Sequence, residues 1–135
     1  MTYTFLEHMA DVKFRAEGST IEEMCVSSAE ALNETIRGDI KILEQKEKSF
    51  KIVGKDKENL LYNFLEEFLF LLDAEDFLVA RIKSISIEGN NLKCVVVGDI
   101  AENYKFTNDV KAITYNDMFV REEDGKFICQ VVLDV

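Results

Sequence analysis

A stretch rich in leucine and phenylalanine, residues 60–72, places the strongest constraint on the fold. Its apolar residues recur at helical spacing and cover a broad face: Leu60, Leu61, Phe64, Leu65, Phe68, Leu69 and Leu72. Phe70 and Leu71 widen this face, so we expect a helix buried on most sides at the centre of the molecule. Asp56 is a candidate N-cap, and the segment Asp73-Ala74-Glu75-Asp76 ends the helix. Glu66 and Glu67 interrupt the stretch, which is shorter than the roughly 20 apolar residues that span a bilayer.

A second helical pattern lies earlier in the chain, at residues 20–37. Thr20 and Glu23 have the spacing of a capping box, in which a hydroxyl and a carboxylate bond the first backbone amides of a helix. One apolar face follows: Ile21, Met24, Cys25, Ala29, Leu32 and Ile36. Arg37 and Gly38 are typical of a helix C-terminus.

The rest of the chain favours antiparallel strands. Short alternating runs occur at residues 2–6, 12–16 and 40–54. The last is clearest at 50–53, and its highly charged middle, 44–48, could be a turn or an exposed edge. Two hairpin signals follow: 79–88 with 92–100 around Gly89-Asn90-Asn91, and 113–122 with 126–134 around Glu123-Asp124-Gly125. Residues 101–109 form a polar connection. We predict an α+β fold in a single domain, residues 1–135, with two helices packed on a largely antiparallel sheet or pair of sheets.

The charge balance limits the classes of partner. The chain has 16 basic and 26 acidic residues and a formal net charge of −10. Nucleic-acid affinity comes largely from lysine and arginine contacts to phosphates, so we expect little direct binding to nucleic acid. Cations or a basic protein fit this charge better, although it also serves solubility.

Three widely spaced cysteines, Cys25, Cys94 and Cys129, favour free thiols in a reducing compartment over a disulfide framework. We expect them to fill the core. The N-terminus lacks the features of a signal peptide, so a cytoplasmic protein is expected.

The first candidate functional cluster is Glu7, His8 and Asp11, which lie between two predicted strands. A histidine and two carboxylates so close in sequence suit metal binding or acid–base chemistry. The alternative, favoured by these residues alone, is that they bond backbone groups in a tight turn.

The second candidate is the C-terminal segment, Val131–Val135. If this apolar strand is ordered to its end, Asp134 and the terminal carboxylate of Val135 lie close together. With a third carboxylate they would suit a hard divalent cation such as Ca²⁺ or Mg²⁺. A simple polar strand end is the alternative.

The third candidate is Lys111, in the segment 109–115. It could pair with the carboxylates of the other two clusters. Alternatively, the segment is an ordinary strand start, with an exposed lysine and with Tyr115 in the core. The sequence has no nucleotide-binding loop, serine-nucleophile elbow or zinc-ligand spacing.

Taken together, three segments resemble the archease family: His8-Met9-Ala10-Asp11-Val12, Val110-Lys111-Ala112-Ile113-Thr114-Tyr115, and Val131-Val132-Leu133-Asp134-Val135. The resemblance implies a non-catalytic partner of the GTP-dependent RNA ligase of the RtcB type, which acts in tRNA splicing and RNA repair. It also implies promotion of ligase guanylylation and of repeated turnover, together with a divalent metal site, commonly described as calcium. Asp11, Asp134 and the carboxylate or carbonyl of Val135 would hold the metal, with Lys111 close by and His8 in a supporting role.

The sequence departs from the family pattern at three positions. Glu7 and Met9 stand where aspartate and threonine are usual, and Asn116 stands where many relatives have histidine. Two other functions stay open: a metal-dependent phosphoesterase with His8 as acid or base, and a general chaperone-like protein-binding module whose carboxylates are structural.

Overall fold

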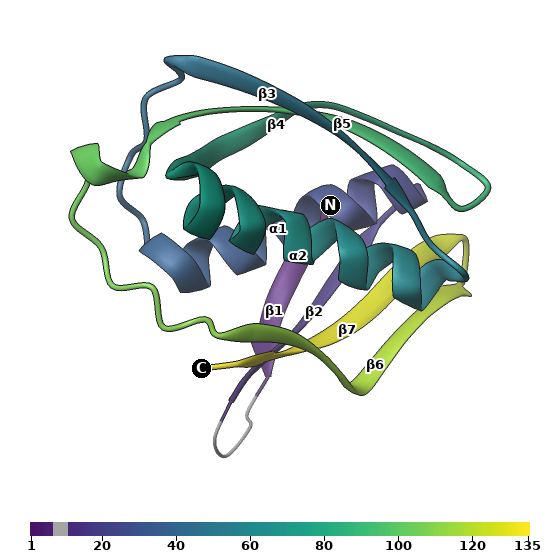
Figure 1. Ribbon diagram of the computed structural model, residues 1–135. Helices are drawn as coiled ribbons and strands as arrows, with labels where there is room; N and C mark the ends of the chain where they lie inside the picture. The colour runs from purple at the N-terminus through teal and green to yellow at the C-terminus, as the bar shows by residue number, and fades with distance from the viewer. Residues whose placement is uncertain (7–10) are drawn as a thin grey trace.

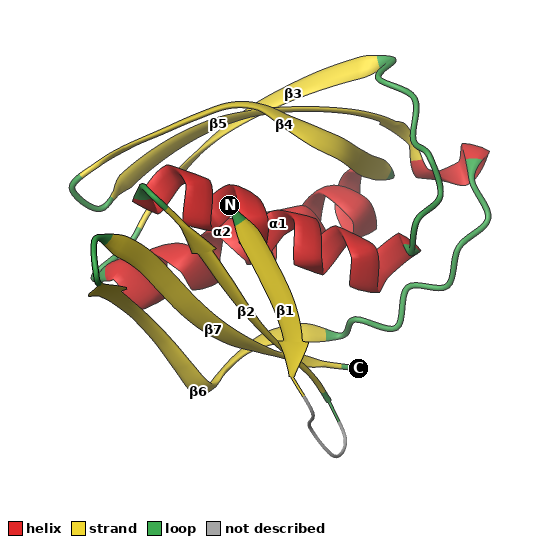
Figure 2. Cartoon of the chain, turned by 180° about the vertical axis from the view of Figure 1, so that it is seen from behind, coloured by secondary structure: helices red, strands yellow, loops and turns green. Residues whose placement is uncertain are grey.

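A computed structural model describes residues 1–6 and 11–135 of the chain. Two antiparallel sheets enclose a pair of helices, so the molecule has a sheet, a helical layer and a second sheet (Figures 1 and 2). The four-stranded sheet has the order β1 (Thr2–Leu6), β2 (Val12–Gly18), β7 (Lys126–Asp134), β6 (Ala112–Glu123). The three-stranded sheet has the order β3 (Lys46–Val53), β5 (Asn91–Ile100), β4 (Phe77–Glu88). This arrangement confirms the predicted α+β class.

The central helix is α2 (Lys57–Glu75), as the apolar stretch predicts. Its side chains fill the space between the sheets, with the following residues buried: Leu60, Leu61, Phe64, Leu65, Phe68, Leu69 and Leu71. Asp56 caps it by accepting a hydrogen bond of 2.7 Å from the backbone amide of Asn59. The prediction that Phe70 adds to the buried face is wrong, because its side chain is 50% exposed. A helix between two sheets still turns one flank to solvent, and Phe70 lies on that flank.

Helix α1 (Ile21–Arg37) has the predicted caps at both ends. The backbone amide of Glu23 donates to the Thr20 hydroxyl at 3.1 Å, and the Glu23 carboxylate accepts from the amide of Ser19 at 2.9 Å. Gly38 follows the helix at φ 64°, a left-handed conformation that glycine adopts without steric cost, and its amide donates to the Glu34 carbonyl at 2.8 Å. These local bonds fix where α1 begins and ends.

Both predicted hairpins are present, but the long third strand is shorter than expected. The tight turns place Gly89, Asp124 and Gly125 at positive φ. Residues 40–45 lie outside regular structure, and β3 begins at Lys46. In that segment the amide of Leu43 donates to the Tyr104 hydroxyl at 2.9 Å. A side chain from the connection before β6 therefore holds the middle of this segment, and at its end the amide of Gln45 donates to the Gly98 carbonyl of β5 at 2.9 Å.

The three cysteines are buried and free, as predicted. Burial raises the pKa of Cys94 to about 12 and that of Cys129 to about 11, and it raises the pKa of Cys25 further still. Their thiols are therefore protonated near neutral pH and unsuited to nucleophilic chemistry. Within the described ranges, no helix is both long and apolar enough to cross a membrane.

Candidate functional site

The starts of β2 and β6 and the end of β7 meet at one end of the four-stranded sheet. Val12 pairs with Leu133, so the same register continued by one residue places Asp11 opposite Asp134. On the other side of β7, Asp134 pairs with Ala112, and the backbone amide of Lys111 donates to the Asp134 carbonyl at 2.7 Å. The sheet therefore brings together three segments that are far apart in the sequence. We call this end of the sheet, with Asp11, Lys111, Asp134 and Val135, the terminal tip.

The two aspartates of the terminal tip share one face of the sheet. Residues directly opposite in the register point to the same side of the sheet, so the Asp11 and Asp134 side chains do too, and both residues are partly exposed. Side chains directly opposite on adjacent antiparallel strands have Cβ atoms about 5 Å apart. Two carboxylates at this separation can both contact one cation.

The donor set at the terminal tip fits a hard divalent cation. Val135 packs against the core directly after Asp134, so its carboxylate or carbonyl would lie beside that residue. The donors are thus carboxylate oxygens, the ligands that Ca²⁺ and Mg²⁺ prefer. Outside residues 7–10, no three or more His, Cys, Asp or Glu side chains are grouped to hold a metal ion. Two aspartates and the terminal carboxylate suit a cation that keeps several water ligands.

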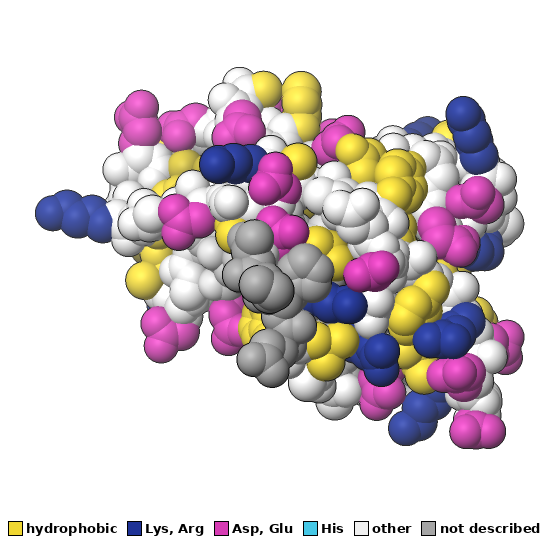
Figure 3. Space-filling model, turned by 90° about the horizontal axis from the view of Figure 1, so that it is seen from below, with side chains coloured by type: hydrophobic (Ala, Val, Ile, Leu, Met, Phe, Trp, Pro, Cys, Tyr) yellow, Lys and Arg dark blue, Asp and Glu magenta, His cyan; other side chains and the backbone are white. Residues whose placement is uncertain are grey.

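An open hollow of about 380 Å³ lies beside Asp11. Apolar side chains of β1 and β2 form part of its wall, and Glu34 and Thr35 of α1 complete it. Lys13 also lines it and forms an ion pair with Asp117 at 3.5 Å. The surface seen from this side shows basic and acidic side chains interleaved with apolar ones rather than one acidic field (Figure 3). A surface of this kind suits contact with another protein.

Two other sequence predictions can be placed. Lys111 is exposed directly before β6, as expected for a strand start. The placement of Tyr115 in the core is wrong, because its side chain is 51% exposed. Its ring stacks on Tyr62 of α2, with centroids 4.3 Å apart, and its hydroxyl accepts from the Asn59 amide at 2.8 Å. Tyr115 thus joins β6 to the outside of α2.

The predicted roles of Glu7 and His8, and the departure at Met9, lie outside the described residues. The metal assignments to Asp11, Asp134 and Val135, and the role of Lys111, stay predictions with the placement given above.

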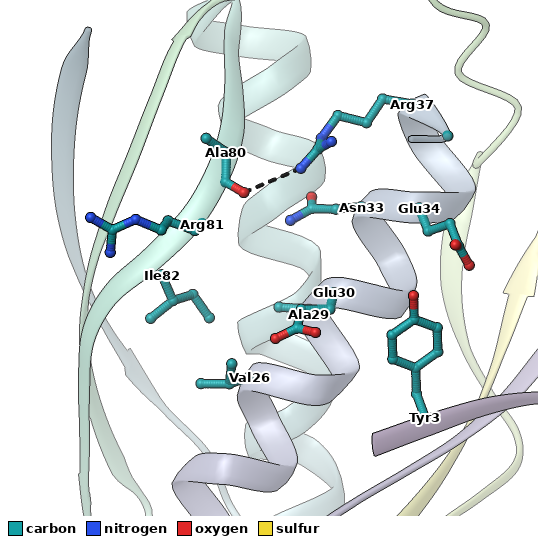
Figure 4. A pocket seen from close by; sticks show the side chains of 11 residues that line it. Tyr3, Val26, Ala29, Glu30, Asn33, Glu34, Arg37, Ala80, Arg81 and Ile82 are labelled. Carbon is teal, nitrogen blue, oxygen red and sulfur yellow. Dashed lines mark hydrogen bonds between the residues drawn. The ribbon is translucent and has the colours of Figure 1, made fainter. Parts of the chain in front are cut away.

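A second hollow, of about 320 Å³, lies between β1, α1 and β4, and no motif of the sequence marks it. Tyr3 lines it from β1, Ile82 from β4, and Glu30, Asn33 and Arg37 from α1 (Figure 4). We call it the edge pocket. The available signal was Asn33, which follows Ala29 by four residues and so puts a polar side chain on the apolar face of the predicted helix.

Partial burial shifts the pKa values of three side chains that line the edge pocket. Burial raises the pKa of Glu30 and lowers the pKa of Arg37. The pKa of Tyr3 is raised, first by burial and then by the negative charge of Glu34, to which it is hydrogen-bonded. The pocket therefore joins a negatively charged mouth to a guanidinium at its far end.

Comparison with known proteins identifies the family. The Archease protein family matches residues 3–135. An archease of Pyrococcus furiosus is 37% identical over 96% of this chain and 95% of its own length, and one of Pyrobaculum neutrophilum is 34% identical over 98% and 95%. Among solved structures, protein 1598 of Methanobacterium thermoautotrophicum has a TM-score of 0.82 at 30% identity, covering 98% of both chains. The fold is also that of an archease from Thermotoga maritima, described as a possible chaperone, with a TM-score of 0.70 at 22% identity over 96% of this chain and 94% of that one. The chain belongs to the archease family.

Proposed function

We propose that this chain is a non-catalytic activator of an RtcB-type RNA ligase in tRNA splicing and RNA repair. It would act in the cytoplasm by promoting guanylylation of the ligase and its repeated turnover. The observation that carries the proposal is the terminal tip, where the strand register aligns Asp11 with Asp134 in a chain that belongs to the archease family. The buried, protonated cysteines remove one class of catalytic nucleophile, which supports an accessory role.

The chemistry of the terminal tip follows from its residues. Asp11, Asp134 and the carboxylate of Val135 would hold a divalent cation, Ca²⁺ being our first candidate. When bound, the cation would supply concentrated positive charge at the tip. The Val135 side chain packs against the core, so its carboxylate or carbonyl would stay beside Asp134. The exposed Lys111 ammonium is available to a carboxylate or phosphate of the partner.

The test is a guanylylation assay with limiting ligase. Asp11→Asn and Asp134→Asn keep side-chain size and remove the charge, so each is expected to lower stimulation at least tenfold. Asp73→Asn is the matched control, because Asp73 is an exposed aspartate at the end of α2, away from the tip. Lys111→Ala tests the contribution of the lysine ammonium beside the two aspartates in the same assay. Full stimulation by both tip variants would refute the proposed role of the site.

The same proteins separate the two alternatives. A phosphoesterase would hydrolyse a phosphoester without the ligase and lose this activity in His8→Ala. A general chaperone would suppress aggregation of an unrelated client equally well with Asp134→Asn. The open hollow at the terminal tip supports the accessory role over the enzyme, since small-molecule sites usually enclose most of their ligand.

A further inference from the structure

The edge pocket lies where two sheet edges face each other. β1 is the outer strand of the four-stranded sheet, and β4 is the outer strand of the three-stranded sheet. Both contact α1, which forms the floor between them (Figures 2 and 4). An outer strand has a row of backbone amides and carbonyls without a partner strand and can accept another chain by strand addition.

Only the first part of the β4 edge is covered within residues 1–6 and 11–135. The Arg37 guanidinium donates to the carbonyls of Val79 and Ala80, each at 3.2 Å, and to that of Ile40 at 2.9 Å. No corresponding cap is present from Ile82 to Glu88 in the described chain. The uncovered part of the edge therefore begins at the pocket.

Asn33 provides an independent sign that the pocket takes a ligand. Its side chain points into the pocket from α1 (Figure 4). The residue is 7% exposed, and its amide has no hydrogen-bond partner in the described part of the chain. Buried amides are nearly always paired, so an unpaired one facing a cavity indicates a missing partner. The N–H and C=O of a side-chain amide can bond the C=O and N–H of a peptide group, as the backbone of a neighbouring strand does.

The charges at the pocket mouth indicate what kind of chain would fit. Glu30 and Glu34 lie one helical turn apart on α1 and line the mouth. On the β4 side, Arg81 bonds Glu44 at 2.8 Å and Lys83 bonds Glu47 at 2.8 Å, so neither cation is left to neutralise the mouth. The amino terminus lies close enough to Glu30 to oppose the effect of burial on its pKa, but burial has the larger effect.

We propose that the edge pocket binds an extended, basic peptide segment of a partner protein. The segment adds to the β4 edge from Ile82 onward, pairs a backbone peptide group with the Asn33 amide, and places a lysine or arginine between Glu30 and Glu34. Val26, Ala29 and Ile82 contact its apolar side chains. This site is separate from the terminal tip, so the proposal does not depend on the ligase being the partner.

The test is an NMR titration of the ¹⁵N-labelled full chain. The probe is a blocked pentapeptide, Val-Thr-Lys-Thr-Val, and the comparison peptide has glutamate in place of lysine. The lysine peptide is expected to shift the Asn33 side-chain signals and the β4 amides, with at least tenfold tighter binding than the glutamate peptide. Glu30→Gln, at the exposed mouth, is expected to weaken binding at least fivefold without changing the fold, and Asn33→Leu to abolish it. Glu58→Gln, on α2 outside the pocket, is the matched control and is expected to bind as the unaltered chain does.

Four results would overturn the proposal. They are the absence of shifts at millimolar peptide, equal binding of the two peptides, shifts confined to other surfaces, and concentration-dependent shifts without peptide, which would indicate a second copy of this chain in the pocket. Because Glu30 is exposed, its variant keeps the test valid if Asn33→Leu alters packing.

Discussion

Replacing Asn33 with leucine is expected to stabilise the protein. An unsatisfied buried amide costs about 1–3 kcal/mol. Leucine also has a higher helix propensity, by a few tenths of a kcal/mol, and the adjacent hollow of about 320 Å³ gives its larger side chain room. Because water can enter this hollow and hydrate the amide, the lower part of the range applies, about 1–2 kcal/mol. The melting temperature should therefore rise by about 3–8 °C.

Asn63→Leu on α2 is the matched control, because its substitution changes helix propensity equally. The Asn63 amide donates to the Val53 carbonyl at 3.1 Å and to Asn59 at 3.3 Å. Leucine at position 63 therefore loses bonds of a kind that Asn33 does not make with the described residues. We expect between no change and a loss of about 1 kcal/mol. Urea denaturation at constant m-value, combined with calorimetry, measures both variants. If Asn33→Leu is as destabilising as Asn63→Leu, then the Asn33 amide has a partner and the reasoning fails.

Three further predictions concern the tip, the sheet and the acid response. Calcium at a hundredfold excess over its dissociation constant should stabilise the unaltered protein by about 2.7 kcal/mol but leave the stability of Asp134→Asn unchanged. An equal rise in melting temperature for the two proteins would mean that the ion binds elsewhere. Gly98→Ala should destabilise by about 1–3 kcal/mol in urea, because its Cβ would lie 2.1 Å from the Leu78 carbonyl oxygen, and a neutral result would mean that β4 moves aside freely. The Tyr104 hydroxyl donates to the Asp99 carboxylate at 2.7 Å, and this bond is the main cause that lowers the pKa of Asp99 below its ordinary 3.8. The bond therefore stabilises the folded state fully above the unfolded pKa of Asp99, and this contribution is lost as pH falls through the folded pKa. Tyr104→Phe should therefore flatten the fall in stability below about pH 4, and an unchanged pH profile would contradict this.

Features that depend on local chemistry were predictable from the sequence. The Thr20 and Glu23 caps, the Asp56 cap and the two hairpin turns involve residues within a few positions of each other. Their bonds form wherever the chain is helical or turned, so the sequence pattern is sufficient. The same holds for the buried faces of α1 and most of α2, which follow from helical spacing.

The wrong predictions involve residues whose surroundings come from distant segments. The segment 40–45 alternates like a strand, but the Tyr104 hydroxyl bonds its middle at Leu43, and bonding to β5 begins at Gln45. Tyr115 is apolar enough for a core, but it stacks outside on Tyr62. Phe70 belongs to a continuous apolar run, but its side chain is half exposed on the solvent flank of α2. Sequence spacing does not report which flank of a helix a sheet will leave open.

The two candidate sites differ in the same way. The terminal tip could be anticipated because family motifs mark each of its three segments, and strand register then aligns Asp11 with Asp134. The edge pocket combines single residues from β1, α1 and β4, and none of them belongs to a motif. Asn33 was visible as a polar residue on an apolar face, but only the structure shows that its amide is buried and has no partner among residues 1–6 and 11–135.

Glu34 connects the two surfaces and decides whether one partner can use both. It lines the edge pocket and also the hollow beside Asp11, and it is hydrogen-bonded to Tyr3. A partner that binds one of these surfaces and reaches across Glu34 would present its second binding segment to the other surface at a high effective concentration. If that partner is the ligase, Glu30→Gln should weaken ligase binding although it lies outside the terminal tip, and the lysine pentapeptide should compete with the ligase. Separate partners would leave ligase affinity unchanged in both experiments, because neither perturbation touches Asp11 or Asp134.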